Sequence, residues 1–213
     1  MSDTIAPVSA IADVLALWGR DGWLTPPLVG IVPAQTPRLG RVRTLQLAAG
    51  SGHGMTPLFE MLSTDLSDHV LVLAGTSGVD AAVWGEILTG AALQQHAVGV
   101  LVDGAVRDRP EMLSLGLPVY ARTQAVVGPN GAMHVVGTDC SVTIASTVID
   151  CDDRVVIDAT GCVHIREADL TEVLDAAGAY AAAEARVVEA ISAGVALAEA
   201  YQIKKTAVAA LRQ

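Results

Sequence analysis

The sequence is poor in aromatic residues, charged residues and cysteine. Of its 213 residues 3% are aromatic and 17% are charged, whereas 52% are hydrophobic. The cysteines, Cys140, Cys151 and Cys162, are odd in number and lack CxxC spacing, which argues against a disulfide framework and a structural zinc site. The five histidines form no HxxxH or HxH pair, so zinc ligation is not expected. We therefore expect reduced cysteines in a cytoplasmic protein.

The sequence also lacks a basic run and a long apolar run. With a net charge of −10 and a pI of about 4.7, it has no clustered Lys and Arg to contact phosphates, so we expect no nucleic-acid partner. No segment reaches the ~20 apolar residues of a membrane span, and no signal peptide is visible, so we expect no membrane partner. The mean hydropathy of +0.47 is high, and apolar surface buried between subunits explains it better than contact with lipid does. This indicates a homo-oligomer.

Helical and strand-like segments alternate between residues 56 and 121. The strand-like segments HVLVLAG (69–75) and VGVLVDG (98–104) are apolar on both faces, as parallel strands covered by two layers should be. This alternation is typical of a parallel α/β sheet. In chain order the pattern predicts a helix over 8–18, a strand over 41–48, a helix from 56, the strand 69–75, a helix over 81–97, the strand 98–104, a short helix over 109–116 and a strand over 118–122.

The remainder of the chain has a different pattern. Short strands separated by turns follow residue 122 and suggest a β-rich layer. One long Ala-rich helix is then predicted from Asp169 to Ala200, with Asp169 as its N-cap and Glu172 completing a capping box. The whole chain is predicted to be one α/β domain, with an N-terminal helix and loop (1–40), an α/β core (41–165) and a C-terminal helical arm (166–213).

The candidate site lies where two predicted parallel strands end. In open α/β sheets, ligands bind beyond the carboxyl ends of the strands. Two such ends, 73–78 and 102–108, are expected to open onto one crevice. The second loop, VDGAVRD, supplies Asp103, Arg107 and Asp108. The GTSG loop at the first end matches no complete phosphate-loop motif.

These side chains suit a metal-assisted reaction on a carboxylate. Arg107 can hold a carboxylate bidentately. Asp108 offers the hard oxygen ligands that Mg²⁺ or Mn²⁺ prefer, and Glu111 can join the metal's outer shell through a water. An adjacent Arg–Asp pair is also common as a solvated surface pair, which is the alternative interpretation.

The segment WGEIL (84–88) offers a second binding element. If a helix begins there, the backbone N–H groups of Gly85, Glu86, Ile87 and Leu88 form an anion-binding site. These N–H groups and Arg107 could hold the carboxylate of a 2-oxo acid. A metal ion could polarise the adjacent carbonyl. A water near Arg107, Glu86 or Glu111 could move the proton. This is the outline of a metal-dependent pyruvate aldolase, and equally of an oxaloacetate decarboxylase.

Two histidines receive structural interpretations. His53 lies in a glycine-rich turn and is more simply a turn residue. His164 lies in a strand pattern and is more simply a structural side chain.

The sequence resembles a known family. The segment 70–122, and above all GE-x-L followed by a strand and DGAVRD, is similar to the RraA-like family, which includes regulator of ribonuclease activity A and 4-hydroxy-4-methyl-2-oxoglutarate aldolase. The aldolase branch carries an acid about twenty residues before Arg–Asp and another shortly after. Here those positions are Glu86, Arg107, Asp108 and Glu111.

The resemblance implies a swivelling β/β/α-type layered fold, assembled as a homotrimer or homohexamer. It implies Mg²⁺ or Mn²⁺ near Asp108, and a 2-oxo acid held by Arg107 and the amides of 85–88, with sites at subunit interfaces. A glutamate of a neighbour's terminal helix is a further candidate ligand, and the choices here are Glu184, Glu189 and Glu199.

Two functions are therefore expected. The first is a metal-dependent carbon–carbon lyase acting on a 4-hydroxy-2-oxo acid, with oxaloacetate decarboxylase activity. The second is a non-catalytic regulatory binding protein of the ribonuclease E inhibitor type. Retention of Arg107 and Asp108 favours the lyase. The sequence departs from the family pattern at SGHGM (51–55) and LSD (66–68), next to the expected site or its support, which is compatible with a divergent member that has a different acyl partner or has lost the activity.

Overall fold

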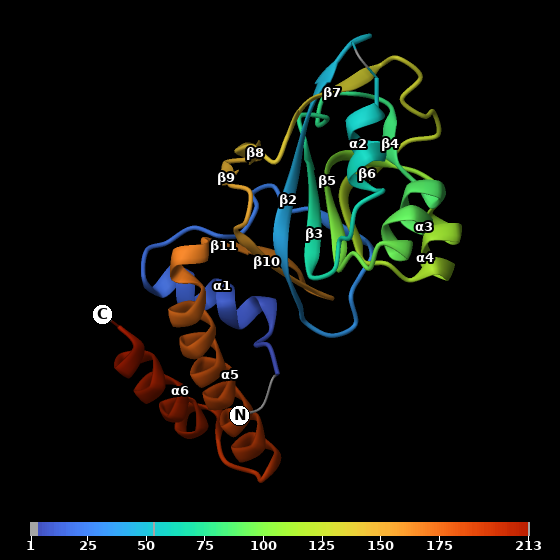
Figure 1. The fold of residues 1–213 in the computed structure, drawn as a ribbon. Coiled ribbons are helices and arrows are strands. Elements are labelled where there is room, and N and C mark those ends of the chain that lie inside the picture. The colour runs from blue at the N-terminus through green and yellow to red at the C-terminus, as the bar shows by residue number, and fades with distance from the viewer. Residues whose placement is uncertain (1–3, 53, 213) are drawn as a thin grey trace.

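A mixed β-sheet of nine strands forms the centre of the described chain (Figure 1). The structure is a computed structural model that describes residues 4–52 and 54–212. The strand order is β1-β6-β5-β3-β2-β10-β11, with β4 beside β5 and β7 beside β2, and β8 and β9 form a separate hairpin. The strands are β1 (Val29–Val32), β2 (Arg38–Ala49), β3 (His69–Ala74), β4 (Ala82–Trp84), β5 (Gly99–Val106), β6 (Val119–Gln124), β7 (Met133–Thr138), β8 (Val142–Ile144), β9 (Thr147–Ile149), β10 (Arg154–Asp158) and β11 (Gly161–Ile165).

Parallel pairing holds the middle of the sheet together. Strand β3 pairs in parallel with β2 and β5, and β5 pairs in parallel with β4 and β6. The flanking strands β1, β7, β10 and β11 join by antiparallel pairing. The predicted α/β fold, with a parallel layer followed by a β-rich part and a long C-terminal helix, is confirmed.

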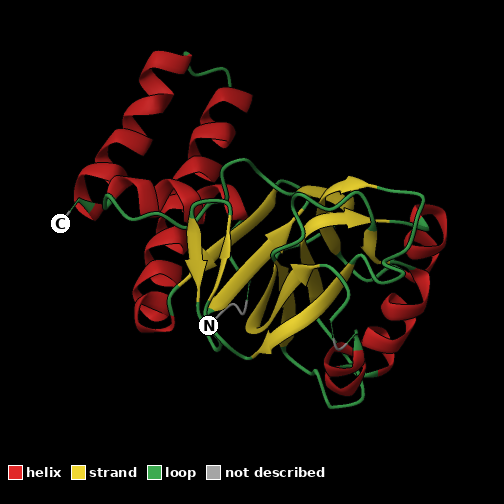
Figure 2. Cartoon of the chain, turned by 90° about the horizontal axis from the view of Figure 1, so that it is seen from above, coloured by secondary structure: helices red, strands yellow, loops and turns green. Residues whose placement is uncertain are grey.

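The helices lie in two groups at opposite ends of the sheet (Figure 2). One group packs on the face formed by alternate residues of β3 and β5, such as Leu71, Leu73 and Val102. The other group packs around β10 and β11 at the far edge. The first group is α2 (Thr56–Met61), α3 (Glu86–Gln94) and α4 (Arg109–Leu115); the second is α1 (Val8–Leu17), the 3-10 turn η1 (Glu167–Asp169), α5 (Leu170–Ser192) and α6 (Leu197–Leu211).

The opposite face of the parallel strands is covered without long helices. Val70, Val72 and Leu101 pack there against residues on either side of β1 and against the β8–β9 hairpin. Both faces of the central strands are therefore buried, which explains why their sequences are apolar at successive positions.

The predicted helix over 81–97 is wrong at its start. Residues 82–84 form β4, which pairs with β5 through Trp84 and Val106, and the helix begins at Glu86. Pairing with a buried strand overrides the helical spacing of this segment. Strand β5 also extends to Val106, so Asp103 lies within the sheet and not in the loop after it.

The predicted helix from Asp169 to Ala200 is two helices. α5 ends at Ser192, and Gly194 has a φ of +89°, a conformation that glycine adopts readily and that commonly ends helices. α6 then packs back against α5. Asp169 is the N-cap residue of α5 without a capping hydrogen bond, because its carboxylate pairs with Arg166 and Arg20.

No helix in the described chain has the length and apolarity required to cross a bilayer. The assignment of the whole chain to one domain stays a prediction.

Tyr120 joins three distant parts of the chain inside the core. Its hydroxyl donates to the backbone oxygen of Asp158 (2.7 Å) and accepts from the amide of Ala34 (2.9 Å). Burial raises the pKa of Tyr120 to about 12, so the hydroxyl keeps the proton that it donates. Asp158 in turn accepts from the amide of Val8, the first residue of α1. This chain of bonds ties the N-terminal segment to the sheet.

Tyr120→Phe should lower the free energy of unfolding by about 2–3 kcal/mol, because it leaves one backbone donor and one backbone acceptor buried without a partner. The matched control is Tyr201→Phe, since Tyr201 is 43% exposed and its change should stay within about 0.5 kcal/mol. Urea denaturation of both variants checks this. Equal effects in the two variants would contradict the role of Tyr120.

Candidate active site

The start of α3 and the end of β5 meet because β4 runs beside β5. The amide of Arg107 donates to the carbonyl oxygen of Trp84 at 3.0 Å. Gly85 then serves as the N-cap residue of α3, and Arg107 and Asp108 follow β5 directly. Two segments more than twenty residues apart in the sequence thereby form one site.

Asp108 has the backbone conformation of a tight turn. Its φ is +58°, in the left-handed region that Asp and Asn tolerate better than other non-glycine residues. Its Oδ2 atom lies 3.4 Å from the amide nitrogen of Glu86 and 3.4 Å from Nε of Arg107. The structure gives Oδ1 no hydrogen bond among the described residues, and 36% of the side chain is exposed. One carboxylate oxygen is therefore available to a ligand.

Two glycines leave room for these charged side chains. A Cβ atom on Gly85 would lie 2.6 Å from Oδ2 of Asp108 and 3.2 Å from Cγ of Arg107. A Cβ atom on Gly128 would lie 3.1 Å from Nη1 of Arg107. Any larger residue at position 85 must displace the carboxylate.

Arg107 and Asp108 open onto a cavity of about 200 Å³. The remainder of its wall is apolar side chain or glycine backbone. The cavity is lined by Met55 and Phe59 of the α2 region, Ala82, Val83 and Trp84 of β4, Gly85, Ile87 and Leu88 at the start of α3, Arg107, Asp108 and Pro129.

The structure brings together five of the residues expected from sequence and leaves three outside. Arg107, Asp108, Gly85, Ile87 and Leu88 line the cavity. The amides of Ile87 and Leu88 belong to the first turn of α3, where N–H groups lack intrahelical acceptors.

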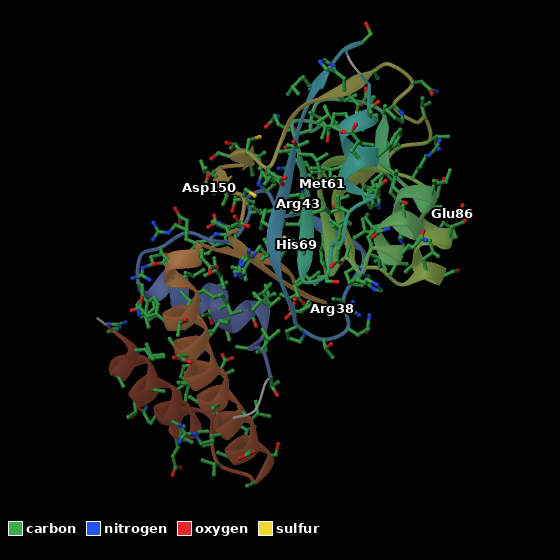
Figure 3. The ribbon with its side chains drawn as sticks, in the orientation of Figure 1. Arg38, Arg43, Met61, His69, Glu86 and Asp150 are labelled. Atoms are coloured by element: carbon green, nitrogen blue, oxygen red, sulfur yellow. The ribbon has the colours of Figure 1, made fainter. Side chains whose placement is uncertain are left out.

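Glu86 and Glu111 do not line the cavity, and both side chains are exposed. Glu86 projects at the outer side of α3 (Figure 3) and contributes its backbone amide to Asp108. Glu111 lies in the first turn of α4. A catalytic role for either carboxylate stays a prediction.

Asp103 is not part of the cavity, contrary to expectation. It lies in β5, 4% exposed, and forms an ion pair with Arg122 of β6. Its backbone oxygen accepts from the hydroxyl of Thr76 (2.8 Å). The ends of β3 and β5 therefore lie side by side as predicted. The 73–78 loop packs against β5 there and does not line the cavity, so the predicted crevice between the two loops is wrong.

Sequence reasoning missed the apolar wall. Phe59 is the only phenylalanine in the sequence and is 54% exposed on the short helix α2, but the sequence carries no signal that it reaches the cavity. Met55 lies in the SGHGM segment that departs from the family pattern. Pro129 comes from a loop whose place no sequence pattern shows. His53 lies outside the described residues.

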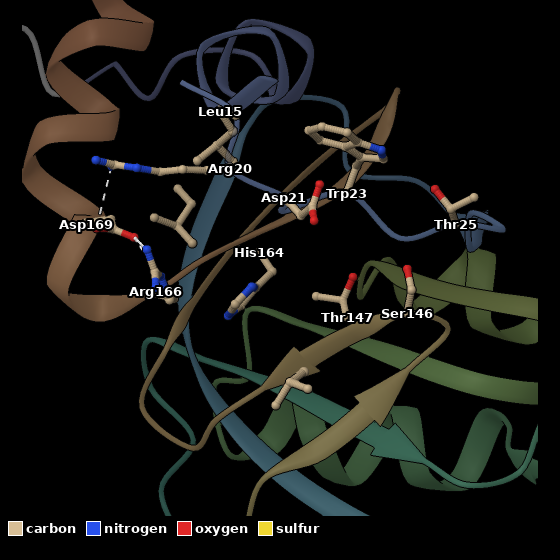
Figure 4. A pocket seen from close by; sticks show the side chains of 13 residues that line it. Leu15, Arg20, Asp21, Trp23, Thr25, Ser146, Thr147, His164, Arg166 and Asp169 are labelled. Atoms are coloured by element: carbon tan, nitrogen blue, oxygen red, sulfur yellow. Dashed lines mark hydrogen bonds and ion pairs between the residues drawn. The ribbon is translucent and has the colours of Figure 1, made fainter. Parts of the chain in front are cut away.

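A larger and more polar cavity lies near the α1 end of the sheet (Figure 4). It encloses about 550 Å³ and is lined in part by Arg20, Arg166, Asp169 and His164. Both arginines pair with Asp169 (3.5 and 2.7 Å). Arg20 also pairs with Glu172 at 3.2 Å, so the two positive charges face two carboxylates of the same chain.

His164 is also engaged. Its Nε2 atom lies 2.7 Å from Oδ2 of Asp153. The same Oδ2 accepts from the amide of Asp150, and Oδ1 accepts from the amide of Glu167. These bonds connect β11, the loop before β10 and η1. The interpretation of His164 as a structural residue agrees with this arrangement.

Comparison with known families identifies the chain. The family model described as RraA-like, Aldolase/RraA, matches residues 8–164. The chain belongs to the RraA-like family. The recognition of this family from segment 70–122 is therefore confirmed.

Individual relatives agree in fold. An uncharacterized protein from Pseudomonas syringae pv. tomato str. DC3000 is 27% identical with a TM-score of 0.81, and the match covers 92% of each chain. RraAS2 of Streptomyces coelicolor, described as an unusual member of the RNase ES inhibitor RraA family, is 22% identical with a TM-score of 0.70, over 80% of this chain and 85% of that one. Protein DlpA of Legionella pneumophila is 29% identical over 103 residues, which are 48% of this chain but only 17% of DlpA.

Gly85→Ala should destabilise the protein by up to about 1 kcal/mol, because alanine is a poorer N-cap than glycine and its Cβ atom must shift Oδ2 of Asp108, the end of a partly exposed side chain. Gly90→Ala is the matched control in the same helix, since no atom lies within 4 Å of its added Cβ. It should stabilise by about 0.4–1 kcal/mol. Thermal unfolding compares the two variants, and a stabilising Gly85→Ala would contradict the close approach.

Proposed function

We propose that this RraA-like protein is a divalent-metal-dependent lyase that cleaves a 4-hydroxy-2-oxo acid, such as 4-hydroxy-4-methyl-2-oxoglutarate, to pyruvate, with oxaloacetate decarboxylation as a related activity. The observation that carries the proposal is the meeting of one guanidinium, one carboxylate and the first turn of α3 at a single small cavity. A 2-oxo acid presents a carboxylate and a neighbouring carbonyl oxygen, and this arrangement offers a partner to each.

Arg107 is proposed to hold the substrate carboxylate. Its side chain lines the cavity and is 43% exposed, so the guanidinium can offer two parallel N–H groups to a carboxylate. The amides of Ile87 and Leu88 add donors at the positive end of the α3 dipole. Gly128 keeps the space beside the guanidinium free.

Asp108 is proposed to hold Mg²⁺ or Mn²⁺. Mg²⁺ in proteins is often bound through one or two carboxylates, with waters and substrate oxygens completing the shell. The free Oδ1 atom of Asp108 beside a partly open cavity fits that mode, and Glu111 is proposed to act through a water. When bound, the metal would polarise the 2-oxo carbonyl as a Lewis acid.

The chain's own groups must also handle the protons. In aldol cleavage the C4 hydroxyl loses its proton, the C3–C4 bond breaks, and C3 is later protonated to give pyruvate. A water near Arg107 is proposed as the proton carrier, with the exposed carboxylates of Glu86 and Glu111 as exchange partners.

The active form is proposed to be a homotrimer or homohexamer in which a neighbour's glutamate completes the site. Glu184 pairs with Lys204 of its own chain at 2.6 Å. Glu189 and Glu199 are exposed and are the better candidates for that role.

A non-catalytic binding protein is the second candidate. The family includes RNase inhibitors as well as aldolases, and RraAS2 is described as a member of an RNase inhibitor family. The described residues contain no group of three or more His, Cys, Asp or Glu side chains placed to hold a metal, which favours this candidate. Metal-dependent turnover decides between the two.

Pyruvate release from oxaloacetate, coupled to lactate dehydrogenase, should require Mg²⁺ or Mn²⁺, stop on addition of EDTA and return with excess metal. Reactions without protein correct for spontaneous decarboxylation. The same assay is run with 4-hydroxy-4-methyl-2-oxoglutarate. Absence of protein-dependent release from both compounds would favour the binding protein.

Asp108→Asn should reduce metal-dependent turnover by at least 100-fold (about 2.7 kcal/mol of barrier) while the fold remains intact, because Asn also tolerates a positive φ. The matched control is Asp80→Asn, since Asp80 is exposed and outside the cavity. Circular dichroism verifies the fold. Retained turnover in the Asp108 variant would exclude this carboxylate as the metal ligand.

Arg107→Lys should raise KM for the 2-oxo acid about tenfold or more, because a point charge replaces a planar fork. Arg109→Lys, two residues further along and outside the cavity, provides the control. Steady-state kinetics measure both. Unchanged kinetics in the Arg107 variant would assign this residue a structural role.

A further inference from the structure

We infer that the larger cavity near α1 is a second binding site, and that it takes a neutral sugar ring. This cavity shares no lining residue with the cavity of Arg107 and Asp108, so its ligand does not depend on the proposed lyase activity. Four features of the wall carry the inference: a fixed shape, paired charges, polar groups without partners and one exposed indole ring.

Backbone contacts fix the shape of the cavity. It lies between the segment 19–25, which follows α1, and the turn of the β8–β9 hairpin (Figure 4). The amide of His164 donates to the carbonyl oxygen of Gly22 at 2.7 Å, and Trp23 forms a β-bridge with Val163. A Cβ atom on Gly22 would lie 2.5 Å from the carbonyl oxygen of His164, so the segment lies directly on β11. The volume of about 550 Å³ is within the roughly 300–1,000 Å³ of small-molecule sites and is ample for one sugar ring.

The charges in the cavity favour a neutral ligand over an ion. On the side of α5, Arg20 pairs with Asp169 and Glu172, and Arg166 pairs with Asp169. An added anion would face these carboxylates, and an added cation would face the two guanidinium groups. Asp21 contributes a carboxylate that has no hydrogen bond or ion pair to the described residues. Because a carboxylate accepts hydrogen bonds at both oxygens, two hydroxyl groups of an uncharged ligand can satisfy it.

His164 offers one ring nitrogen to the cavity. The residue is 6% exposed, and its Nε2 atom is bonded to Asp153. Its Nδ1 atom has no hydrogen-bond partner in residues 4–52 and 54–212, yet no buried side-chain nitrogen or oxygen of those residues lacks one. Nδ1 is therefore not buried but open to the cavity that the ring lines. With Nε2 held by a carboxylate, this nitrogen is placed to bond one hydroxyl group of a ligand.

Three hydroxyl side chains line the same cavity. Thr25 lies on the side of the 19–25 segment, and Ser146 and Thr147 lie on the side of the β8–β9 hairpin (Figure 4). None of these hydroxyl groups has a hydrogen-bond partner within the part of the chain that the structure describes. A hydroxyl group both donates and accepts, as do the hydroxyl groups of a sugar. A ligand with hydroxyl groups around a ring can thus bond both sides of the cavity at once.

Trp23 supplies an apolar surface among these polar groups. Its side chain lines the cavity and is 38% exposed. The other two tryptophans are engaged, since Trp84 is 1% exposed and Nε1 of Trp18 donates to the backbone oxygen of Leu211 at 2.7 Å. A sugar ring carries C–H groups on its face and hydroxyl groups on its edge, so the face can pack on the indole while the edge forms hydrogen bonds. A small polyol such as glycerol has no apolar face and fits less well.

Saturation-transfer difference NMR with the full chain tests the ligand class. The neutral probes are methyl β-D-glucopyranoside, methyl β-D-galactopyranoside and methyl α-D-mannopyranoside, and the competing ions are acetate and methylammonium. At least one glycoside should bind with a Kd of about 10 mM or tighter, and neither ion should displace it. Absence of glycoside binding up to about 50 mM, as when a neighbouring subunit fills the cavity, would overturn the inference. Displacement of the glycoside by either ion would overturn it as well.

Asp21→Asn should weaken glycoside binding about tenfold, because an amide offers one acceptor oxygen in place of two and carries no charge. The matched control is Asp80→Asn, which removes the same charge at an exposed position outside the cavity and should leave the Kd unchanged. Equal weakening in the two variants, or none in the Asp21 variant, would contradict a sugar bound at this carboxylate.

Tryptophan fluorescence locates the bound sugar. The glycoside should shift the emission of the unaltered protein, because the Trp23 ring exchanges water for the ligand. Trp23→Phe should retain the NMR-detected binding within about threefold, since phenylalanine also offers an apolar ring, but should lose the emission shift. A shift that persists in this variant would place the sugar elsewhere and overturn the assignment of the cavity.

Discussion

The close approach of the Asp108 carboxylate to the backbone of Gly85 is the constraint on which the candidate site depends. Parallel pairing of β4 with β5 places the two residues side by side, and the missing side chain at position 85 leaves room for Oδ2. The left-handed backbone of Asp108 turns its carboxylate toward the start of α3. A carboxylate, a guanidinium and a helix N-terminus therefore share one small cavity because of backbone geometry that two short segments supply.

Charge pairing distinguishes this cavity from the other polar regions of the chain. Asp103 with Arg122, Asp153 with His164 and Asp169 with its two arginines are pairs that fix one element to another. In the larger cavity of Figure 4 the arginines are held in this way. The Arg107–Asp108 contact, at 3.4 Å, joins two consecutive residues and fixes no separate element, and both side chains are more than one-third exposed. Their charges remain available to a ligand, which is why the smaller cavity is the better candidate.

Much of the fold could be predicted from periodicity. Strands buried on both faces read as apolar runs, so β3 and β5 were recognisable, and their ends indicated where Arg107 and Asp108 lie. The helical spacing of 81–97 concealed β4, because tertiary pairing overrides local propensity. Without β4, the sequence could not show that Gly85 lies against the carboxylate of Asp108 and leaves room for it. Phe59 and Pro129 reach the cavity only through the packing of α2 and a distant loop, and a single sequence carries no signal for that. The exposed positions of Glu86 and Glu111 depend on side-chain direction, which spacing does not fix.

Anomalous diffraction from crystals of the full chain grown with Mn²⁺ and pyruvate tests the account most directly. The account predicts one anomalous peak at about 2.1–2.2 Å from a carboxylate oxygen of Asp108, a distance typical of small divalent cations, with the pyruvate carboxylate on the guanidinium of Arg107. A peak held by other residues, or pyruvate bound away from Arg107, would contradict the claim that the Gly85–Asp108 contact builds a metal-dependent lyase site.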